Sequence, residues 1–219
     1  MKIEQIPEAY ADTSSFSYHV DDDWYAELDH FRSLFAEDWP AAPITDVHAA
    51  HSFLTREARL IDDGRFNDWL ELFAGDGLYW IPVTAGGGDP RREVSHAFDD
   101  HRRLTDRVYW LRTGLAYSQL PPSRTRRLIG NVETFEDLDG TRLIRSNFVI
   151  HEFRAGIAKT YVGWYGHVVR DLGSGVGADR DTADRDTADG NGSGGWRIRM
   201  KMVNLIDSDQ YHENLTLVF

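Results

Sequence analysis

The sequence contains no cysteine and only three lysines, Lys2, Lys159 and Lys201. The absence of cysteine excludes disulfides, thiolate metal sites and cysteine-held iron–sulfur clusters from this chain. No apolar run approaches the roughly 20 residues of a membrane-spanning helix. No apolar run of signal-peptide length follows Met1 either. We therefore expect a cytoplasmic protein without a membrane partner.

Negative charge predominates among the 219 residues, which carry a formal net charge of -12. An acidic surface repels the phosphate groups of nucleic acids and anionic membranes, so neither is expected as a partner. Hydrophobic residues make up 41% of the chain and aromatic residues 12%, which is enough to build a core. The length suits one folded domain.

The first 45 residues are predicted to be an N-terminal extension with one short amphipathic helix, and residues 46–219 a single domain. Four large apolar residues in the extension recur at helical spacing: Trp24, Leu28, Phe31 and Phe35. The acidic run at 21–23 precedes them, and negative charge near a helix N-terminus complements the helix dipole.

Two further helices and a strand are predicted at the start of the domain. Asp46 can cap the first helix, and Gly64 is suited to the left-handed conformation that ends a helix. The apolar stripe of this helix consists of Val47, Ala50, Phe53 or Leu54, Ala58 and Ile61. A second helix follows from Arg65, with Trp69 on its apolar face, and residues 78–83 are strand-like.

The second half of the chain is predicted to be rich in strands. The expected strands are 108–117, 126–135, 142–153, 160–172, 196–206 and a short last one at 215–219. Asp139-Gly140 is a typical hairpin turn between two of them. Helices followed by a run of strands indicate an α+β fold. The polar segment 173–195 contains Asp-Arg-Asp-Thr-Ala twice in succession, and we expect it to be a disordered loop.

Three stretches resemble the beta subunits of aromatic-ring-hydroxylating dioxygenases. The first is the run EARLIDDGRFNDWLELF at 57–73, followed by YWIP at 79–82. The second and most specific is PPSRTR at 121–126, with Asn131-Val132 behind it. The third is the Gly-Trp-Arg strand from 195, with an Asp at 207 and an Asn-Leu tail at 214–215.

This resemblance implies a cone-shaped fold of the scytalone dehydratase and ketosteroid isomerase type, with N-terminal helices packed on a long, curved, mainly antiparallel sheet. It also implies a non-catalytic subunit that holds together a hexamer of three alpha and three beta chains. In such a complex the Rieske 2Fe-2S cluster and the mononuclear Fe(II) belong to the alpha subunit. We therefore expect no catalytic residue, cofactor or metal in this chain.

The resemblance and the local chemistry together suggest which residues contact other subunits. Arg124 and Arg126 carry planar guanidinium groups that suit carboxylates on a neighbouring chain. The strand 196–202 alternates apolar and basic side chains, so its basic face is expected to meet an acidic neighbour. The full set of expected interface residues is Pro121, Pro122, Ser123, Arg124, Arg126, Asn131, Arg197, Arg199 and Asn214.

Two alternative kinds of site compete with this interpretation. Glu93, His96 and His101 have a spacing that is used in non-haem iron sites, although their polar surroundings favour a solvated turn. A stand-alone cone-fold dehydratase or isomerase, or a small-ligand-binding cone domain, would instead need a base in an apolar pocket. The candidate bases are His51, Asp76, His151 and His167.

Overall fold

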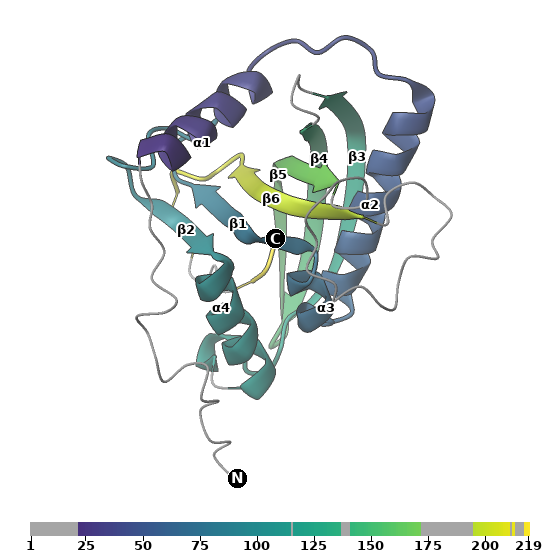
Figure 1. The fold of residues 1–219 in the computed structure, drawn as a ribbon. Helices are drawn as coiled ribbons and strands as arrows, with labels where there is room; N and C mark the ends of the chain where they lie inside the picture. The colour runs from purple at the N-terminus through teal and green to yellow at the C-terminus, as the bar shows by residue number, and fades with distance from the viewer. Residues whose placement is uncertain (1–21, 115, 137–140, 172–194, 211, 213–216) are drawn as a thin grey trace, which may run out of the picture.

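The computed structural model describes residues 22–114, 116–136, 141–171, 195–210, 212 and 217–219. Within them the chain forms, in order, α1 (Asp22–Phe35), α2 (Ile44–Asp62), α3 (Phe66–Leu70), β1 (Phe73–Pro82), β2 (Ser95–Asp100), α4 (His101–Thr113), η2 (Tyr117–Gln119), β3 (Arg124–Glu136), β4 (Arg142–Arg154), β5 (Ile157–Asp171) and β6 (Trp196–Leu205). Figure 1 shows the long strands curving past α2 and α3.

The strands form one sheet in the order β2-β1-β6-β5-β4-β3. Neighbouring strands are antiparallel except for the β1–β6 pair, which is parallel. Three long strands, β3, β4 and β5, pair along most of their length and make up the main wall. The predicted α+β class and the mainly antiparallel, cone-shaped sheet are therefore confirmed.

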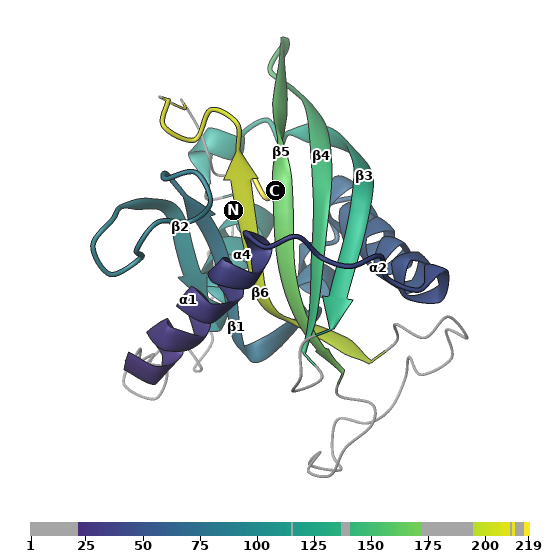
Figure 2. The same ribbon diagram turned by 90° about the horizontal axis from the view of Figure 1, so that it is seen from above.

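Helices cover both faces of the sheet, so the molecule has two clusters of buried apolar residues. The inner cluster lies under α2, α3 and α4 and includes Leu54, Trp69, Tyr79, Phe148, Tyr165 and Phe219. The outer cluster lies under α1 and includes Leu28, Phe31, Trp80, Met200 and Met202. In Figure 2, α1 crosses the sheet over β1 and β6, on the other side from α2. The predicted amphipathic helix is confirmed by α1.

The start of α2 differs from the prediction, whereas its end agrees. The helix begins at Ile44 with Pro43 in the capping position, and Asp46 makes no capping hydrogen bond. Asp46 is therefore an acidic residue of the first turn, where it complements the helix dipole. At the other end Gly64 has a φ of 71°, the left-handed conformation predicted for it.

The prediction of a strand at 108–117 is wrong, because these residues lie mainly in α4 and η2. Leu104 and Val108, four residues apart, bury one side of α4. The Asp100 side chain accepts a hydrogen bond from the Arg103 N–H at 2.8 Å and so caps the helix. Gly114 ends it with a φ of 68°. The aromatic and β-branched residues that suggested a strand are thus outweighed by good signals at both ends of a helix.

A bulge in β6 overturns the expected separation of an apolar and a basic face. Val168 pairs with Met200 and Val169 with Ile198, which leaves Arg199 as an extra residue opposite β5. One extra residue reverses the face to which the following side chains point. Ile198 therefore packs in the inner cluster and Met200 in the outer one. Both faces of β6 are covered within the chain.

The other four long strands lie within a few residues of their predicted bounds, but parts of the prediction fall outside the described residues. These parts are the turn at 139–140, nearly all of the segment 173–195, and Asn214. Residues 217–219 are described and are not in a strand, contrary to the expected last strand. None of the helices that the structure describes has the length and apolar character needed to cross a membrane.

Candidate functional site

Three ionisable side chains from distant parts of the chain meet inside the cone. Glu57 of α2 accepts a hydrogen bond from Lys201 of β6, with 2.8 Å between Nζ and Oε1. The other oxygen of Glu57 lies 3.0 Å from Nε2 of His167 on β5. The Trp69 indole N–H of α3 also donates to Glu57, at 3.1 Å. We call Glu57, His167 and Lys201 the interior polar cluster.

Burial and mutual attraction set the charges of the interior polar cluster. Burial by itself would raise the pKa of Glu57, but Lys201 and His167 outweigh it and hold the pKa well below its usual range. Burial lowers the pKa of Lys201 to about 8, against the opposing effect of Glu57. Burial likewise lowers the pKa of His167. At neutral pH the cluster is therefore a Glu57–Lys201 ion pair beside a neutral imidazole.

The interior polar cluster is closed to substrates. His167 is 0% exposed, Lys201 1% and Glu57 2%. Both oxygens of Glu57 are engaged by side chains of the chain itself. A general base must reach the proton that it abstracts, so this geometry does not favour catalysis by His167.

The other candidate bases are exposed rather than enclosed. His51 is on the exposed side of α2, next to Thr55. His151 is exposed on β4 and lies 3.1 Å from the Thr160 hydroxyl. Asp76 is half-exposed and forms ion pairs with Arg170 and Arg199. All three are exposed, so none has the enclosed apolar surroundings that a cone-fold isomerase or dehydratase gives its base.

The three residues with iron-site spacing do not come together as a metal site, and two of them have other partners. His96 lies on β2, with Nε2 2.7 Å from the Ser208 carbonyl oxygen. Glu93 accepts hydrogen bonds from the Thr84 hydroxyl and the Asp89 N–H. His101 is the first residue of α4. Among the residues that the structure describes, no group of three or more histidine, aspartate or glutamate side chains is placed to hold a metal ion.

The second region of interest is the segment 121–126, which we call the docking segment. Pro121 and Pro122 are exposed, at the end of the connection from α4 to β3. Ser123 is fixed from two sides: its N–H donates to the Gln119 side chain at 3.2 Å and its hydroxyl donates to Glu152. The segment is therefore anchored by Ser123 and open to solvent around it.

Arg124 and Arg126 are exposed and have no carboxylate partner in the part of the chain that the structure describes. The Arg124 guanidinium lies 4.9 Å above the Phe153 ring. Arg126 donates to the backbone carbonyls of Asp62 and Thr125, at 3.2 and 2.8 Å. Both line an open groove of about 610 Å³ that also includes exposed Phe153 and His151.

Arg127, unlike Arg124 and Arg126, is buried and has a carboxylate partner within the chain, and this pairing fixes the end of the docking segment. Its side chain is 1% exposed and forms an ion pair with Asp62 at the end of α2. Asp62 also accepts from the Arg127 N–H at 2.9 Å and from the Thr125 hydroxyl at 2.7 Å. Alternate residues of β3 thus point inwards to Asp62, while Arg124 and Arg126 point outwards.

The remaining interface candidates do not join the docking segment. Asn131 is exposed at a bulge in β3, with a φ of 51°. Arg197 is at the start of β6, and its guanidinium donates to the Trp196 carbonyl at 3.1 Å. Arg199 is 2% exposed and is paired with Glu27 of α1 and with Asp76. The expectation that Arg199 faces another subunit is wrong, because its acidic neighbours are in its own chain.

The sequence patterns did not indicate that Glu57, Lys201 and Asp62 are structural residues. A signal for Glu57 was present, because it lies between Leu54 and Ile61 on the apolar stripe of α2. A carboxylate on that stripe has to be buried and therefore needs a partner. The partner itself could not be deduced, since Lys201 lies 144 residues further along the chain.

Comparison with known proteins is consistent with this architecture. Residues 56–181 match the family described as ring hydroxylating beta subunit. The chain belongs to this family. A curated relative, the beta subunit of toluate 1,2-dioxygenase from Pseudomonas putida, is 33% identical over 111 residues, which are 48% of this chain and 68% of the relative.

Solved structures of beta subunits share the fold. The beta subunit of benzoate 1,2-dioxygenase from Burkholderia mallei superposes with a TM-score of 0.56 and 20% identity, covering 82% of this chain and 100% of that one. A chain of naphthalene 1,2-dioxygenase gives a TM-score of 0.60 and 18% identity, covering 90% of this chain and 94% of that one. The ring hydroxylating beta subunit has the cone predicted for it, and the PPSRTR motif of the docking segment lies within the matched region.

Proposed function

We propose that this chain is the non-catalytic beta subunit of a Rieske non-haem iron ring-hydroxylating dioxygenase and that it scaffolds a hexamer of three alpha and three beta subunits. Membership of the beta-subunit family supports this role. In the proposed complex the 2Fe-2S cluster and the mononuclear Fe(II) are in the alpha subunit. The beta subunit then contributes to assembly of the complex and not to the reaction. The interior polar cluster, which is closed to substrates, is consistent with this role.

The observation that carries the proposal is the pair of exposed, carboxylate-free guanidinium groups of Arg124 and Arg126. Several other exposed arginines pair with acidic side chains, as Arg65 does with Asp68 and Arg91 with Asp89. In a chain with a net charge of -12, these two guanidinium groups lie without an ion-pair partner among the described residues, beside an exposed phenylalanine. Such an arrangement suits carboxylates of a neighbouring subunit, and arginine is enriched in protein interfaces.

The stand-alone dehydratase or isomerase is less well supported. Its most plausible base, His167, is enclosed and bound to Glu57. No described feature opens the interior polar cluster to a substrate, because the residues that line the groove at the docking segment do not include Glu57, His167 or Lys201. The scaffolding role needs no such opening.

The test is co-expression of the alpha subunit with the variant Arg124→Ala/Arg126→Ala. Loss of one partner of a shielded ion pair costs about 3–5 kcal/mol, against about 0–1 kcal/mol for an exposed pair. We therefore expect the hexamer to dissociate during size exclusion while the isolated variant keeps its circular dichroism spectrum. Arg124→Lys/Arg126→Lys should restore little, because lysine lacks the bidentate fork.

The matched control removes two exposed arginines away from the docking segment. Arg92→Ala/Arg102→Ala makes the same change of net charge and should leave the hexamer intact. A normal yield of hexamer from the Arg124/Arg126 variant would show that the docking segment is only solvated. An equal loss with both double variants would assign the effect to net charge instead.

A further inference from the structure

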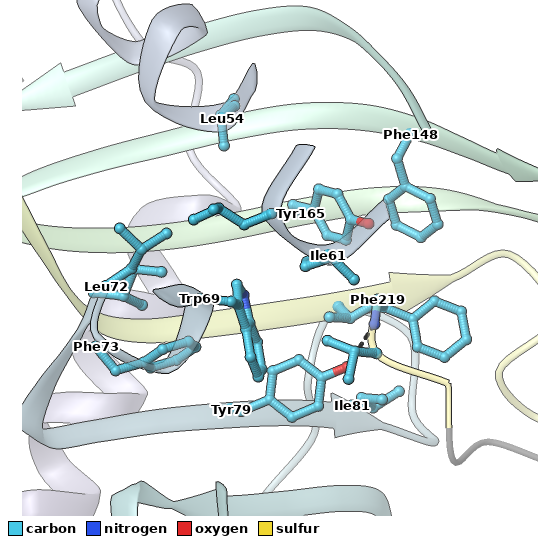
Figure 3. Packing of buried hydrophobic residues seen from close by; sticks show 14 of the residues in the cluster. Leu54, Ile61, Trp69, Leu72, Phe73, Tyr79, Ile81, Phe148, Tyr165 and Phe219 are labelled. Atoms are coloured by element: carbon cyan, nitrogen blue, oxygen red, sulfur yellow. Dashed lines mark hydrogen bonds between the residues drawn. The ribbon is translucent and has the colours of Figure 1, made fainter. Parts of the chain in front are cut away.

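A small cavity lies beside the docking segment, where the end of α2 meets α3, α4 and the start of β3. Its volume is about 110 Å³. Ile61 of α2, which Figure 3 labels among the side chains of the inner cluster, forms part of the wall. Phe66 of α3 and Leu111 of α4 add further apolar surface. We call the space between Ile61, Phe66, Leu111 and Pro122 the α2–α4 cavity.

The α2–α4 cavity reaches from the core to the surface. On the inner side Ile61 is 4% exposed and Thr125 7%. Gly64 and Pro122, which also line the cavity, are exposed to solvent. A small molecule therefore has a route into the cavity between the end of α2 and the docking segment.

The polar side chains of the wall are hydrogen-bonded within the chain. The Thr125 hydroxyl donates to Asp62 at 2.7 Å. The Ser123 N–H donates to the Gln119 side chain at 3.2 Å, and the Ser123 hydroxyl donates to Glu152. In the described part of the chain, none of the buried side-chain nitrogen and oxygen atoms that lack a partner belongs to this wall. The cavity therefore offers a ligand mainly apolar contact.

The volume and the lining together define the kind of ligand that fits. Unfilled space beside a core lowers stability, because the surrounding side chains lose packing contacts. An apolar cavity of about 150 Å³ remains dry and takes up benzene. The α2–α4 cavity is of the same order, so it suits one apolar ring and is too small for two fused rings.

We propose that the α2–α4 cavity is a binding site for a small apolar molecule of the size of a single six-membered ring. Ile61, Phe66 and Leu111 supply the apolar contact surface. Pro122 and Ser123 supply the side that belongs to the docking segment, so the bound ring contacts that segment from within. The proposal does not depend on the scaffolding role, because it concerns this chain alone.

The first experiment offers three probes to the unchanged chain. Benzene should raise the melting temperature by several degrees in a saturable manner. Pyrazine has the same ring size but two nitrogen acceptors, and it should bind at least about tenfold more weakly, because it leaves water without gaining hydrogen bonds. Naphthalene should have no effect, because it is too large. No effect of benzene, or equal binding of benzene and pyrazine, would overturn the proposal.

Two neighbouring residues of α4 locate the site. Leu111→Trp places an indole in the α2–α4 cavity and should abolish the effect of benzene. Trp110 lines a separate, larger hollow of about 370 Å³ at the surface of α4 and does not line the α2–α4 cavity. Trp110→Leu is therefore the matched control and should retain the effect. Survival of the effect in Leu111→Trp, or its loss in Trp110→Leu, would place the ring elsewhere.

Hydrogen exchange tests the contact with the docking segment. The Ser123 N–H lies at the wall, whereas the Arg103 N–H is held by Asp100 at the start of α4. Bound benzene should slow exchange of the Ser123 N–H more than that of the Arg103 N–H. An equal change at both groups would report general stabilisation only and would contradict a contact with the docking segment.

Phe66→Ala keeps the site testable if Leu111→Trp does not fold. The substitution enlarges the α2–α4 cavity by most of a phenyl ring. Naphthalene should therefore raise the melting temperature of Phe66→Ala, although it leaves the unchanged chain unaffected. A Phe66→Ala protein that does not respond to naphthalene would show that Phe66 does not bound a ligand site, and the proposal would fail.

Discussion

Lys201 and Glu57 form a buried ion pair, with 2.8 Å between Nζ and Oε1, although they are 144 residues apart in the chain. The pair joins α2 to β6, which lies near the middle of the sheet. Lys201 also lies 4.5 Å from the centre of the Tyr165 ring, which gives its charge a second favourable contact. Removing water from two charges is costly, so the pair specifies how α2 sits on the sheet more than it adds stability.

Glu57→Gln should therefore destabilise the chain strongly. The substitution leaves the Lys201 ammonium buried without a counter-ion, a situation that costs about 3–5 kcal/mol. Urea unfolding of the isolated chain measures this loss, with Glu71→Gln at an exposed position as the control. The double variant Glu57→Leu/Lys201→Met removes both charges and should recover most of the stability. A double variant as unstable as Glu57→Gln would mean that the charges themselves are needed.

His167 should make stability depend on pH below about 6.5, the usual pKa of histidine. Burial lowers the pKa of His167 in the folded chain, so on acidification the unfolded chain takes up a proton first. The free energy of unfolding then falls with falling pH, by up to about 1.4 kcal/mol per unit. Protonation of Glu57 adds to this loss only below the pKa that Glu57 has in the unfolded chain. Lys201 makes the free energy of unfolding depend on pH only above about pH 8.

The variant His167→Gln keeps a hydrogen-bond donor but does not titrate. Its urea midpoint should change less between pH 7 and pH 5 than that of the unchanged chain. His151→Gln, at an exposed position of β4, should retain the full dependence. Parallel curves for all three proteins would mean that His167 titrates normally in the folded chain.

Asp100→Ala tests the helix that replaces the predicted strand. The Asp100 side chain caps α4 through the Arg103 N–H, and loss of such a cap costs about 0.5–2 kcal/mol. Asp106→Ala, within the same helix, removes an equal charge without affecting the cap and should cost less. Thermal unfolding that ranks the two variants in the reverse order would contradict the capping role.

Glu27→Gln tests whether α1 is tied to the sheet. Glu27 pairs with Arg170 of β5 and with the buried Arg199 of β6. Loss of its charge leaves Asp76 as the remaining acidic partner of Arg199, which should cost about 1–3 kcal/mol. Glu37→Gln, just beyond α1 and exposed, is the control. Equal stability of the two variants would show that α1 is held by its apolar residues alone.

The predictable part of the fold is the part that depends on local periodicity. The stripe of α2, the left-handed Gly64 and the long strands β3 to β5 follow from spacings within one element, so their bounds were close to those observed. The prediction failed for α4, where aromatic and β-branched residues obscured the signals of Asp100 and Gly114. It also failed for β6, because a one-residue bulge is set by pairing with β5 and leaves no mark in the alternation of its own side chains.

The same limit applies to the candidate site. PPSRTR was recognisable because its residues are contiguous, and the structure adds that Ser123 is anchored within the chain while Arg124 and Arg126 are exposed. The partners within the interior polar cluster were not predictable, since they come from elements far apart in the chain. Arg199 is an example. The alternation of apolar and basic residues around it predicts an exposed basic face, whereas in the folded chain Arg199 pairs with Glu27 and Asp76.

The most direct test of the scaffolding role is the mass of the complex formed when this chain is co-expressed with the ring-hydroxylating alpha subunit of the same genome. Light scattering coupled to size exclusion measures that mass without reference to activity. The proposed role predicts one species that contains both chains in equal number, with the mass of three alpha and three beta subunits. Separate elution of this chain as a monomer, beside an alpha subunit that assembles fully without it, would contradict the role.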